Sequence, residues 1–108
     1  MEAVKWNGDS VTILDQRLLP LKEVYNTYKN YTDVAYAIKS METRGAPAIG
    51  ITAGMGIALA AKTITAKSLE EFKEEMEKVL NLFASTRPTA VNLFWTINRM
   101  RSLILSAR

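Results

Sequence analysis

The spacing of apolar residues changes once along the chain, and the change separates two kinds of structure. In the first part, Val4 and Trp6 alternate with polar residues, and Val11 and Ile13 resume the alternation after the pair Asn7-Gly8. A period of two is typical of a half-buried strand, and an Asn-Gly pair tolerates the positive φ of a tight turn. The sequence therefore predicts a β-hairpin near the N-terminus.

A third strand is predicted after this hairpin. Pro20 interrupts the alternation, and the segment from Val24 to Tyr28 then combines β-branched and aromatic residues. Such residues favour strands, although a short helix is the alternative for this segment. We expect residues 1–30 to form a small antiparallel sheet.

From Thr32 onward the apolar positions recur with a period near 3.6, which predicts helices. Val34, Ile38 and Met41 share one face of a first helix over residues 33–43, with Thr32 as its predicted N-cap. In a second helix, Pro47 occupies the first turn, where its missing N–H is not needed, and the pattern continues to about Lys62.

The second helix is expected to be central. Gly50, Gly54 and Ala58 follow one another at intervals of four and give it a smooth stripe. A neighbouring helix can approach such a stripe closely, because small side chains leave the backbone uncovered. We interpret the stripe as a packing surface.

Two further helices follow. Ser68 and Glu71 form a capping box at the start of the third helix, and its core-facing stripe comprises Leu69, Phe72, Met76, Val79, Leu80 and Phe83. Pro88 begins a fourth helix, whose predicted inner face comprises Val91, Phe94, Ile97, Met100 and Ile104. No glycine, asparagine or proline closes this helix before Arg108, so we expect the chain to be part of a longer protein.

The predicted fold class is therefore α+β: a small N-terminal antiparallel β-sheet, residues 1–30, followed by a four-helix bundle, residues 31–108. A chain of 108 residues has room for one hydrophobic core, so residues 1–108 are expected to form one domain. Apolar residues make up 48% and charged residues 23% of the chain, which is the balance of a folded protein.

Composition excludes several kinds of function. The chain has no cysteine and no histidine, so disulfides, thiolate or imidazole metal sites and serine–histidine catalytic pairs are excluded within it. The net charge of +3 is spread without a run of basic residues, and we expect no nucleic-acid partner. The apolar stretch 45–61 is too short for a membrane span, and the N-terminus does not resemble a secretory signal. The expected location is the cytoplasm.

Two arginines precede predicted helix starts. Arg44 stands three positions before Pro47, and Arg87 stands directly before Pro88. A helix N-terminus carries unpaired N–H groups and a partial positive charge, so an added guanidinium makes a site suited to a phosphate or carboxylate. Gly45 lets the backbone approach a ligand, because it has no Cβ. The alternative for each arginine is a solvated side chain or one bonded to a nearby carbonyl.

Other polar and aromatic residues have competing interpretations. The triplet from Asp15 to Arg17 is near a candidate site, but a turn network that ties the sheet to the helices is the favoured interpretation. Asn92 either faces the same pocket as Arg87 or caps a neighbouring loop. Trp6 and Trp95 are expected in the core or an interface.

Three motifs carry a family resemblance over essentially the whole chain. LDQRLLP (residues 14–20), ETRGAPAIGITAGMGIAL (42–59) and STRPTAVNLFW (85–95) together resemble the N-terminal domain of the methylthioribose-1-phosphate isomerases. The wider superfamily includes ribose-1,5-bisphosphate isomerase and the regulatory subunits of translation initiation factor 2B.

The resemblance implies a function in methionine salvage. It implies conversion of the aldose 5-methylthioribose 1-phosphate to the ketose 5-methylthioribulose 1-phosphate, with no metal or nucleotide cofactor. The family places its two motifs at the substrate, which corresponds here to Arg44, Gly45, Ala46 and Arg87. Its acid/base cysteine and aspartate lie in a Rossmann-like C-terminal domain that this chain lacks.

Three expectations follow from this resemblance. The chain has no catalytic residue of its own and should be inactive alone, because proton transfer needs a positioned acid/base pair. Its partners are a small sugar phosphate and the missing C-terminal domain, in a full-length homodimer. The alternatives are a regulatory or nucleotide-sensing subunit akin to factor 2B, a ribose-1,5-bisphosphate isomerase, or a helical interaction domain without a ligand.

Overall fold

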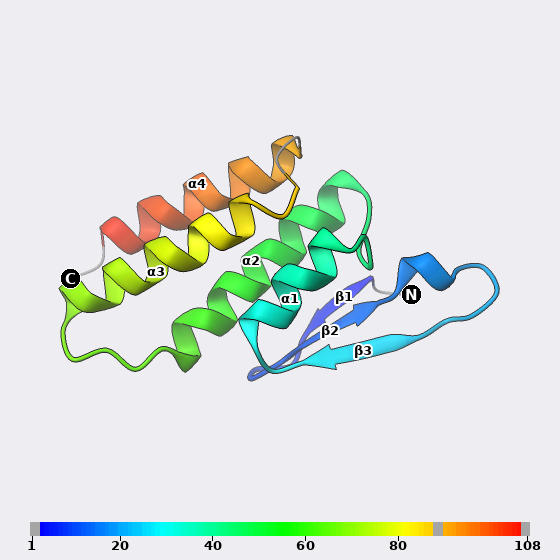
Figure 1. Ribbon diagram of the computed structural model, residues 1–108, viewed down its shortest axis with the longest axis horizontal. Helices are drawn as coiled ribbons and strands as arrows, with labels where there is room; N and C mark the ends of the chain where they lie inside the picture. The colour runs from blue at the N-terminus through cyan, green and yellow to red at the C-terminus, as the bar shows by residue number, and fades with distance from the viewer. Residues whose placement is uncertain (1–2, 88–89, 107–108) are drawn as a thin grey trace.

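A computed structural model describes residues 3–87 and 90–106 as a three-stranded sheet followed by four helices (Figure 1). The predicted α+β fold class is confirmed. In chain order the elements are β1 (Val4–Trp6), β2 (Val11–Leu14), the 3-10 turn η1 (Gln16–Leu18), β3 (Tyr25–Tyr28), α1 (Tyr31–Lys39), α2 (Ala46–Thr63), α3 (Leu69–Ala84) and α4 (Val91–Leu105).

The sheet is antiparallel with the order β1-β2-β3, so the predicted hairpin and third strand are both present. Trp6 pairs with Val11, and Val11 pairs in turn with Tyr28. The connection between the first two strands spans four residues, and Gly8 within it has a φ of 94°, the positive value expected there. Val11 and Ile13 are fully buried and join the core of the helices.

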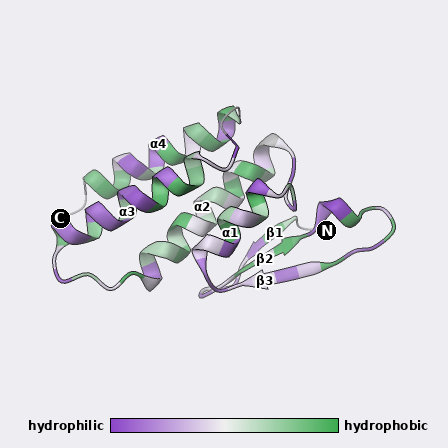
Figure 2. Ribbon diagram, in the orientation of Figure 1, coloured by the Kyte–Doolittle hydropathy of each residue, from purple (hydrophilic) through white to green (hydrophobic). Residues whose placement is uncertain are grey.

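The helices run alternately up and down, so α1 and α3 end where α2 and α4 begin (Figure 1). As predicted, α2 is central: it contacts the other three helices and strands β1 and β2. It is apolar or neutral along most of its length, whereas α3 alternates between polar and apolar faces (Figure 2). This difference is expected, because a helix covered on several sides needs apolar residues all round.

The glycine stripe on α2 packs against α4, as the sequence predicts. A Cβ atom at Gly50 would lie 3.1 Å from Thr96 Oγ1 and 3.4 Å from the Asn92 carbonyl oxygen. At Gly54 it would lie 3.6 Å from Thr96 Cγ2. The small residues therefore let the two helices approach closely near their N-terminal ends.

A basic side chain ties the other end of α2 to the hairpin. Lys62 Nζ donates a hydrogen bond to the Gly8 carbonyl oxygen at 2.5 Å and lies 5.9 Å from the centre of the Trp6 ring. Trp6 is half-buried against the core, so its predicted core placement is correct. Trp95 is 64% exposed and does not belong to the core.

The start and end of the first helix were predicted wrongly. Its N-cap is Asn30, whose side chain accepts from the Thr32 N–H at 2.9 Å and from the Thr32 hydroxyl at 2.7 Å, so Thr32 is itself helical. The helix ends at Lys39, and Met41 has a φ of 67°, which is incompatible with a right-handed helix. Met41 is consequently exposed.

The inner face of the fourth helix was also predicted in part wrongly. Val91 is 78% exposed and Phe94 is 36% exposed, whereas Leu93 is buried together with Ile97. Met100 and Ile104 pack against the core as predicted, so the difference is confined to the first turn of the helix. The predicted helix start at Pro88 lies outside the described residues.

The third helix agrees closely with its prediction. Ser68 is the N-cap, and its hydroxyl accepts from the Glu71 N–H at 3.1 Å. The buried residues of this helix are Met76, Val79, Leu80 and Phe83. Phe72 is partly buried against the core, whereas Leu69 in the first turn is 41% exposed.

Candidate functional site

The candidate site lies at the end of the bundle where α2 and α4 both begin. The segment from Ser40 to Gly45, called the strap here, connects α1 to α2 and carries Arg44, and the segment after α3 carries Arg87. Figure 1 shows both connections at the same end of the molecule. The up-and-down topology therefore brings two arginines that are far apart in the sequence to one end.

The start of α2 is open to a ligand. Gly45 is the N-cap with a φ of 92°, and no side chain in the described part of the chain caps the first N–H groups of the helix. Arg44 and Gly45 are both exposed, and Ala46 is the first residue of α2. Pro47 in the first turn has no N–H of its own. The Gly45 carbonyl accepts from Ile49 N at 3.0 Å, which is the first hydrogen bond of the helix. The first N–H groups of a helix have no acceptor within it, so they are suited to bind an anion.

Arg87 has an unusual environment. Its Nη1 atom is buried and has no hydrogen-bond partner among the described residues. Its backbone is fixed, because the Arg87 carbonyl accepts from Ala90 N at 2.9 Å and the preceding Thr86 hydroxyl donates to the Phe83 carbonyl at 2.6 Å. A buried guanidinium N–H without an acceptor is costly, so this nitrogen is suited to a ligand oxygen.

A cleft separates the first turns of α2 and α4. Its volume is about 360 Å³, and the described residues that line it include no ionisable side chain: Pro47, Gly50, Ile51, Asn92, Trp95 and Thr96. Asn92, the additional candidate, therefore lies in this cleft on the exposed side of α4. The cleft suits an uncharged, partly apolar group beside the first turn of α2.

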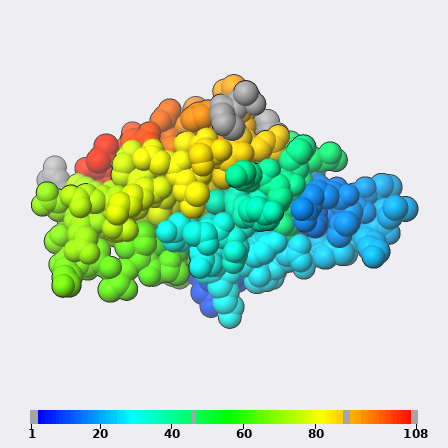
Figure 3. Space-filling view, in the orientation of Figure 1, coloured from blue at the N-terminus to red at the C-terminus, as the bar shows by residue number. Residues whose placement is uncertain are grey.

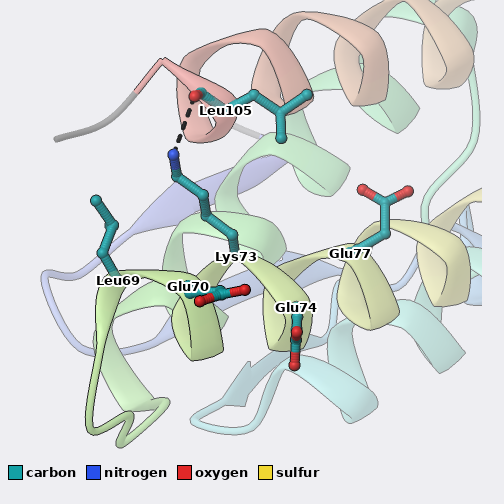
Figure 4. A pocket seen from close by; sticks show the side chains of 6 residues that line it. All are labelled: Leu69, Glu70, Lys73, Glu74, Glu77 and Leu105. Carbon is teal, nitrogen blue, oxygen red and sulfur yellow. Dashed lines mark hydrogen bonds between the residues drawn. The ribbon is translucent and has the colours of Figure 1, made fainter.

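A larger groove lies elsewhere, between the first turns of α3 and the end of α4 (Figure 4). It has a volume of about 530 Å³ and is lined by Leu69, Glu70, Lys73, Glu74, Glu77 and Leu105. Its one basic group, Lys73 Nζ, donates to the Leu105 carbonyl at 3.1 Å. Three carboxylates against one lysine make this groove unsuitable for a phosphate.

The polar triplet after β2 forms a network with the strap, as the favoured interpretation predicts. Asp15 is buried and accepts from Arg17 Nε at 2.9 Å and from Arg17 Nη2 at 2.7 Å. These hydrogen bonds hold the pKa of Asp15 below its usual value. The Gln16 N–H donates to the Glu42 carbonyl at 2.8 Å, which joins the end of the sheet to the strap.

Glu42 was missed by sequence reasoning. It is only 3% exposed, and Tyr28 Oη donates to its two carboxylate oxygens at 2.9 and 2.8 Å. Burial, together with this hydrogen bond to the carboxylate, raises the pKa of Tyr28 above its usual value. The available signal was an acidic residue two positions before Arg44, within the motif that carries the resemblance.

Two negative findings concern the residues that the structure describes. No group of three or more acidic, cysteine or histidine residues there is placed to hold a metal ion. Within the same residues, no helix has the length and apolar character needed to cross a membrane.

Comparison with known proteins now identifies the family. The model of the initiation factor 2 subunit family matches residues 42–107, a range that includes both arginines and helices α2, α3 and α4. The chain belongs to the initiation factor 2 subunit family. Within this family, the resemblance to the methylthioribose-1-phosphate isomerases is confirmed by the relatives that the chain matches.

Two curated relatives are named methylthioribose-1-phosphate isomerase. The protein from Trichlorobacter lovleyi is 49% identical over 105 residues, which cover 97% of this chain and 30% of the relative. The protein from Geobacter sulfurreducens is 52% identical over 98 residues, which cover 91% of this chain and 28% of the relative. The chain thus spans less than a third of the length of either relative.

Two solved structures share the fold. The 5-methylthioribose 1-phosphate isomerase from Pyrococcus horikoshii matches with a TM-score of 0.91 and 47% identity, over 95% of this chain and 29% of that one. The delta subunit of translation initiation factor eIF-2B from A. fulgidus matches with a TM-score of 0.89 and 38% identity, over 100% of this chain and 32% of that one. The same fold therefore occurs in an isomerase and in a translation factor subunit.

Proposed function

We propose that this chain is the substrate-binding part of a methylthioribose-1-phosphate isomerase. In this proposal Arg44, Arg87 and the backbone N–H groups of Gly45 and Ala46 hold the substrate phosphate. The full protein acts in methionine salvage as a cytoplasmic homodimer without a metal or nucleotide cofactor, and its catalytic acid and base lie in a further Rossmann-like domain. The isomerase names of relatives at about 50% identity support this assignment.

One observation carries the phosphate-binding role: the buried Nη1 atom of Arg87, in the connection between α3 and α4, lacks a partner in the described part of the chain. A phosphate oxygen would satisfy this N–H, and the uncapped start of α2 would add backbone donors and a favourable dipole. Arg44, exposed beside these donors, adds a second positive charge. The arrangement binds a phosphate group with charge-assisted hydrogen bonds.

The lining of the cleft favours the methylthio substrate over ribose 1,5-bisphosphate. Ile51 and Trp95 present apolar surface there, and the lining residues carry no charge that would balance a second phosphate. Leaving a second phosphate without a counter-charge costs binding free energy. We therefore expect methylthioribose 1-phosphate to bind more tightly than ribose 1,5-bisphosphate in parallel calorimetric titrations.

The phosphate-binding role is tested by arginine replacement. Arg44→Met and Arg87→Met should each weaken binding of methylthioribose 1-phosphate about tenfold, since a charge-assisted hydrogen bond contributes about 1.5–3 kcal/mol. Calorimetry gives the affinity, and the amide signals of Gly45 and Ala46 report the location. Arg101→Met is the matched control, because it removes the same charge from an arginine that pairs with Glu77 on α3. Equal affinity in all four proteins would reject the role.

The regulatory alternative rests on the similarity to the factor 2B subunit. The same titration distinguishes it, with a nucleoside monophosphate as a second probe. Tighter binding of the nucleotide than of methylthioribose 1-phosphate would favour a nucleotide-sensing subunit, whereas the opposite order supports the isomerase.

A further inference from the structure

The Glu42 carboxylate, two residues before Arg44, is held by strand β3. Its side chain is 4% exposed. Besides the Tyr28 hydroxyl, Asn26 Nδ2 donates to Glu42 Oε1 at 2.8 Å. Asn26 and Tyr28 are two positions apart on β3, so their side chains lie on the same face of the sheet and both reach toward the strap. These hydrogen bonds attach the strap to the sheet through a single side chain.

The backbone of Glu42 is fixed as well. Its N–H donates to the Ala37 carbonyl at 2.9 Å, and its own carbonyl accepts from Gln16 N at 2.8 Å. In Figure 3 the atoms of the strap lie directly against those of the segment that follows β2. The residue is thus held by α1 on one side and by the sheet and η1 on the other.

A neighbouring ion pair compensates the buried charge. Arg17 Nη2 lies 2.7 Å from Asp15 Oδ2 and 4.0 Å from Glu42 Oε2. One guanidinium therefore faces two buried carboxylates. Removing a partner from such a network leaves a buried charge unpaired and is strongly destabilising, so the network holds one arrangement.

Only three residues separate Glu42 from the first residue of α2. Thr43 is fully buried, and its hydroxyl lies 3.4 Å from the Thr52 hydroxyl of α2. Arg44 and Gly45 follow, and Gly45 has the positive φ that turns the chain into the helix. The position of Glu42 consequently limits where Arg44 and the first N–H groups of α2 can lie.

We propose that Glu42 is a positioning residue, which anchors the strap to β3 and thereby fixes Arg44 and the start of α2 for phosphate binding. This inference rests on the proposed function. The physical gain is pre-organisation: a strap that is ordered before binding loses less conformational entropy when the ligand arrives. It also gives the small sheet a role in the site, although the described strands contribute no lining residue to the cleft.

The test compares four variants of the 108-residue chain. Glu42→Ala removes the carboxylate that anchors the strap. Tyr28→Phe keeps this carboxylate and removes only the tyrosine hydroxyl that donates to it. Glu42→Gln keeps the shape and an oxygen that accepts from both Tyr28 and Asn26. Thr27→Val is the matched control, because it removes a hydrogen bond with Thr12 (2.8 Å) from the exposed face of the same strand.

Two measurements are made on each variant by nuclear magnetic resonance. The first records the amide signals of Thr43, Arg44 and Gly45 without ligand. The second titrates inorganic phosphate and follows Gly45. We expect Tyr28→Phe and Glu42→Ala to move the strap signals and to weaken phosphate binding about threefold and about tenfold, respectively. We expect Glu42→Gln to restore binding to within about twofold, and Thr27→Val to leave both measurements unchanged.

The outcomes separate the two proposals. If the unmodified chain binds phosphate and Tyr28→Phe binds it equally well with unmoved strap signals, the positioning role is rejected and the proposed function stands. If the unmodified chain binds neither phosphate nor methylthioribose 1-phosphate, the proposed function fails, and the ligand-free signals alone decide whether Glu42 anchors the strap. Should Glu42→Ala not fold, Tyr28→Phe still gives the answer.

Discussion

At the scale of single residues, two glycines of α2 differ sharply in their surroundings. A Cβ atom at Gly56 would lie 2.5 Å from Phe83 Cζ and 2.8 Å from Val34 Cγ1, whereas at Gly54 it would meet only Thr96 Cγ2 at 3.6 Å. Gly56→Ala should therefore lower the free energy of unfolding by about 1–3 kcal/mol through overpacking. Gly54→Ala is the control and should raise it by about 0.5–1 kcal/mol, the helix-propensity gain. Urea denaturation measures both, and equal effects would contradict this packing argument.

Asp15 should make the stability depend on pH in the acid range. Because Arg17 lowers the pKa of Asp15 in the folded protein below its reference value of 3.8, the ion pair stabilises the fold above about pH 4. That contribution is lost as the pH falls below the reference value and through the folded pKa. Asp15→Asn and Arg17→Met should each lower the free energy of unfolding at pH 7 and flatten its decline on acidification. The double variant should lose less free energy of unfolding than the two single variants lose together, because both changes remove the same interaction.

At the scale of elements, the start of α2 depends on a glycine. Gly45 has a φ of 92° and Gly8, in the hairpin, has a φ of 94°, and a Cβ atom at either position would meet nothing within 4 Å. Alanine at each site should cost about 1–2 kcal/mol of stability from backbone strain alone. Gly45→Ala should also weaken phosphate binding, because the strain shifts the first N–H groups of α2, whereas Gly8→Ala should not. Melting curves and phosphate titrations of the two variants measure these effects. Weaker phosphate binding in both variants would indicate general destabilisation and not a local effect at α2.

The elements that the sequence predicts best are those with local signals. The cap at Ser68 and the stripe of α3 depend on residues within a few turns of one another, and the α2 stripe is similarly local. The errors fall where two local signals compete. Asn30 and Thr32 are both suitable N-cap residues. Which of them caps the helix depends on where the chain leaves the sheet and the helix begins. For the first turn of α4, the pattern allowed two neighbouring faces, and the tertiary packing buries the one with Leu93.

At the scale of the whole molecule, the same distinction explains which candidate site residues the sequence indicates. Arg44 and Arg87 were selected from helix-start electrostatics, a local argument, and the fold places both connections at one end of the bundle. Glu42 was missed because its hydrogen bonds reach 14 and 16 positions back along the chain, to Tyr28 and Asn26. Such contacts follow from the register of β3 against β2 and from the path of the strap. Neither can be obtained from residue spacing alone.

The whole chain should bind a sugar phosphate without isomerising it. Moving a proton between adjacent sugar carbons needs a positioned acid and base. Among the described residues, the cleft has no ionisable lining residue, and the nearby carboxylates of Asp15 and Glu42 are buried and hydrogen-bonded to Arg17 and Tyr28. The guanidinium groups of Arg44 and Arg87 offer hydrogen-bond donors and no acceptor, so they are not suited to take a proton from a sugar carbon. Incubating methylthioribose 1-phosphate with the 108-residue chain should therefore yield no ketose by nuclear magnetic resonance, although Gly45 responds to the ligand. Ketose formation that Arg87→Met abolishes would show that these residues suffice for catalysis.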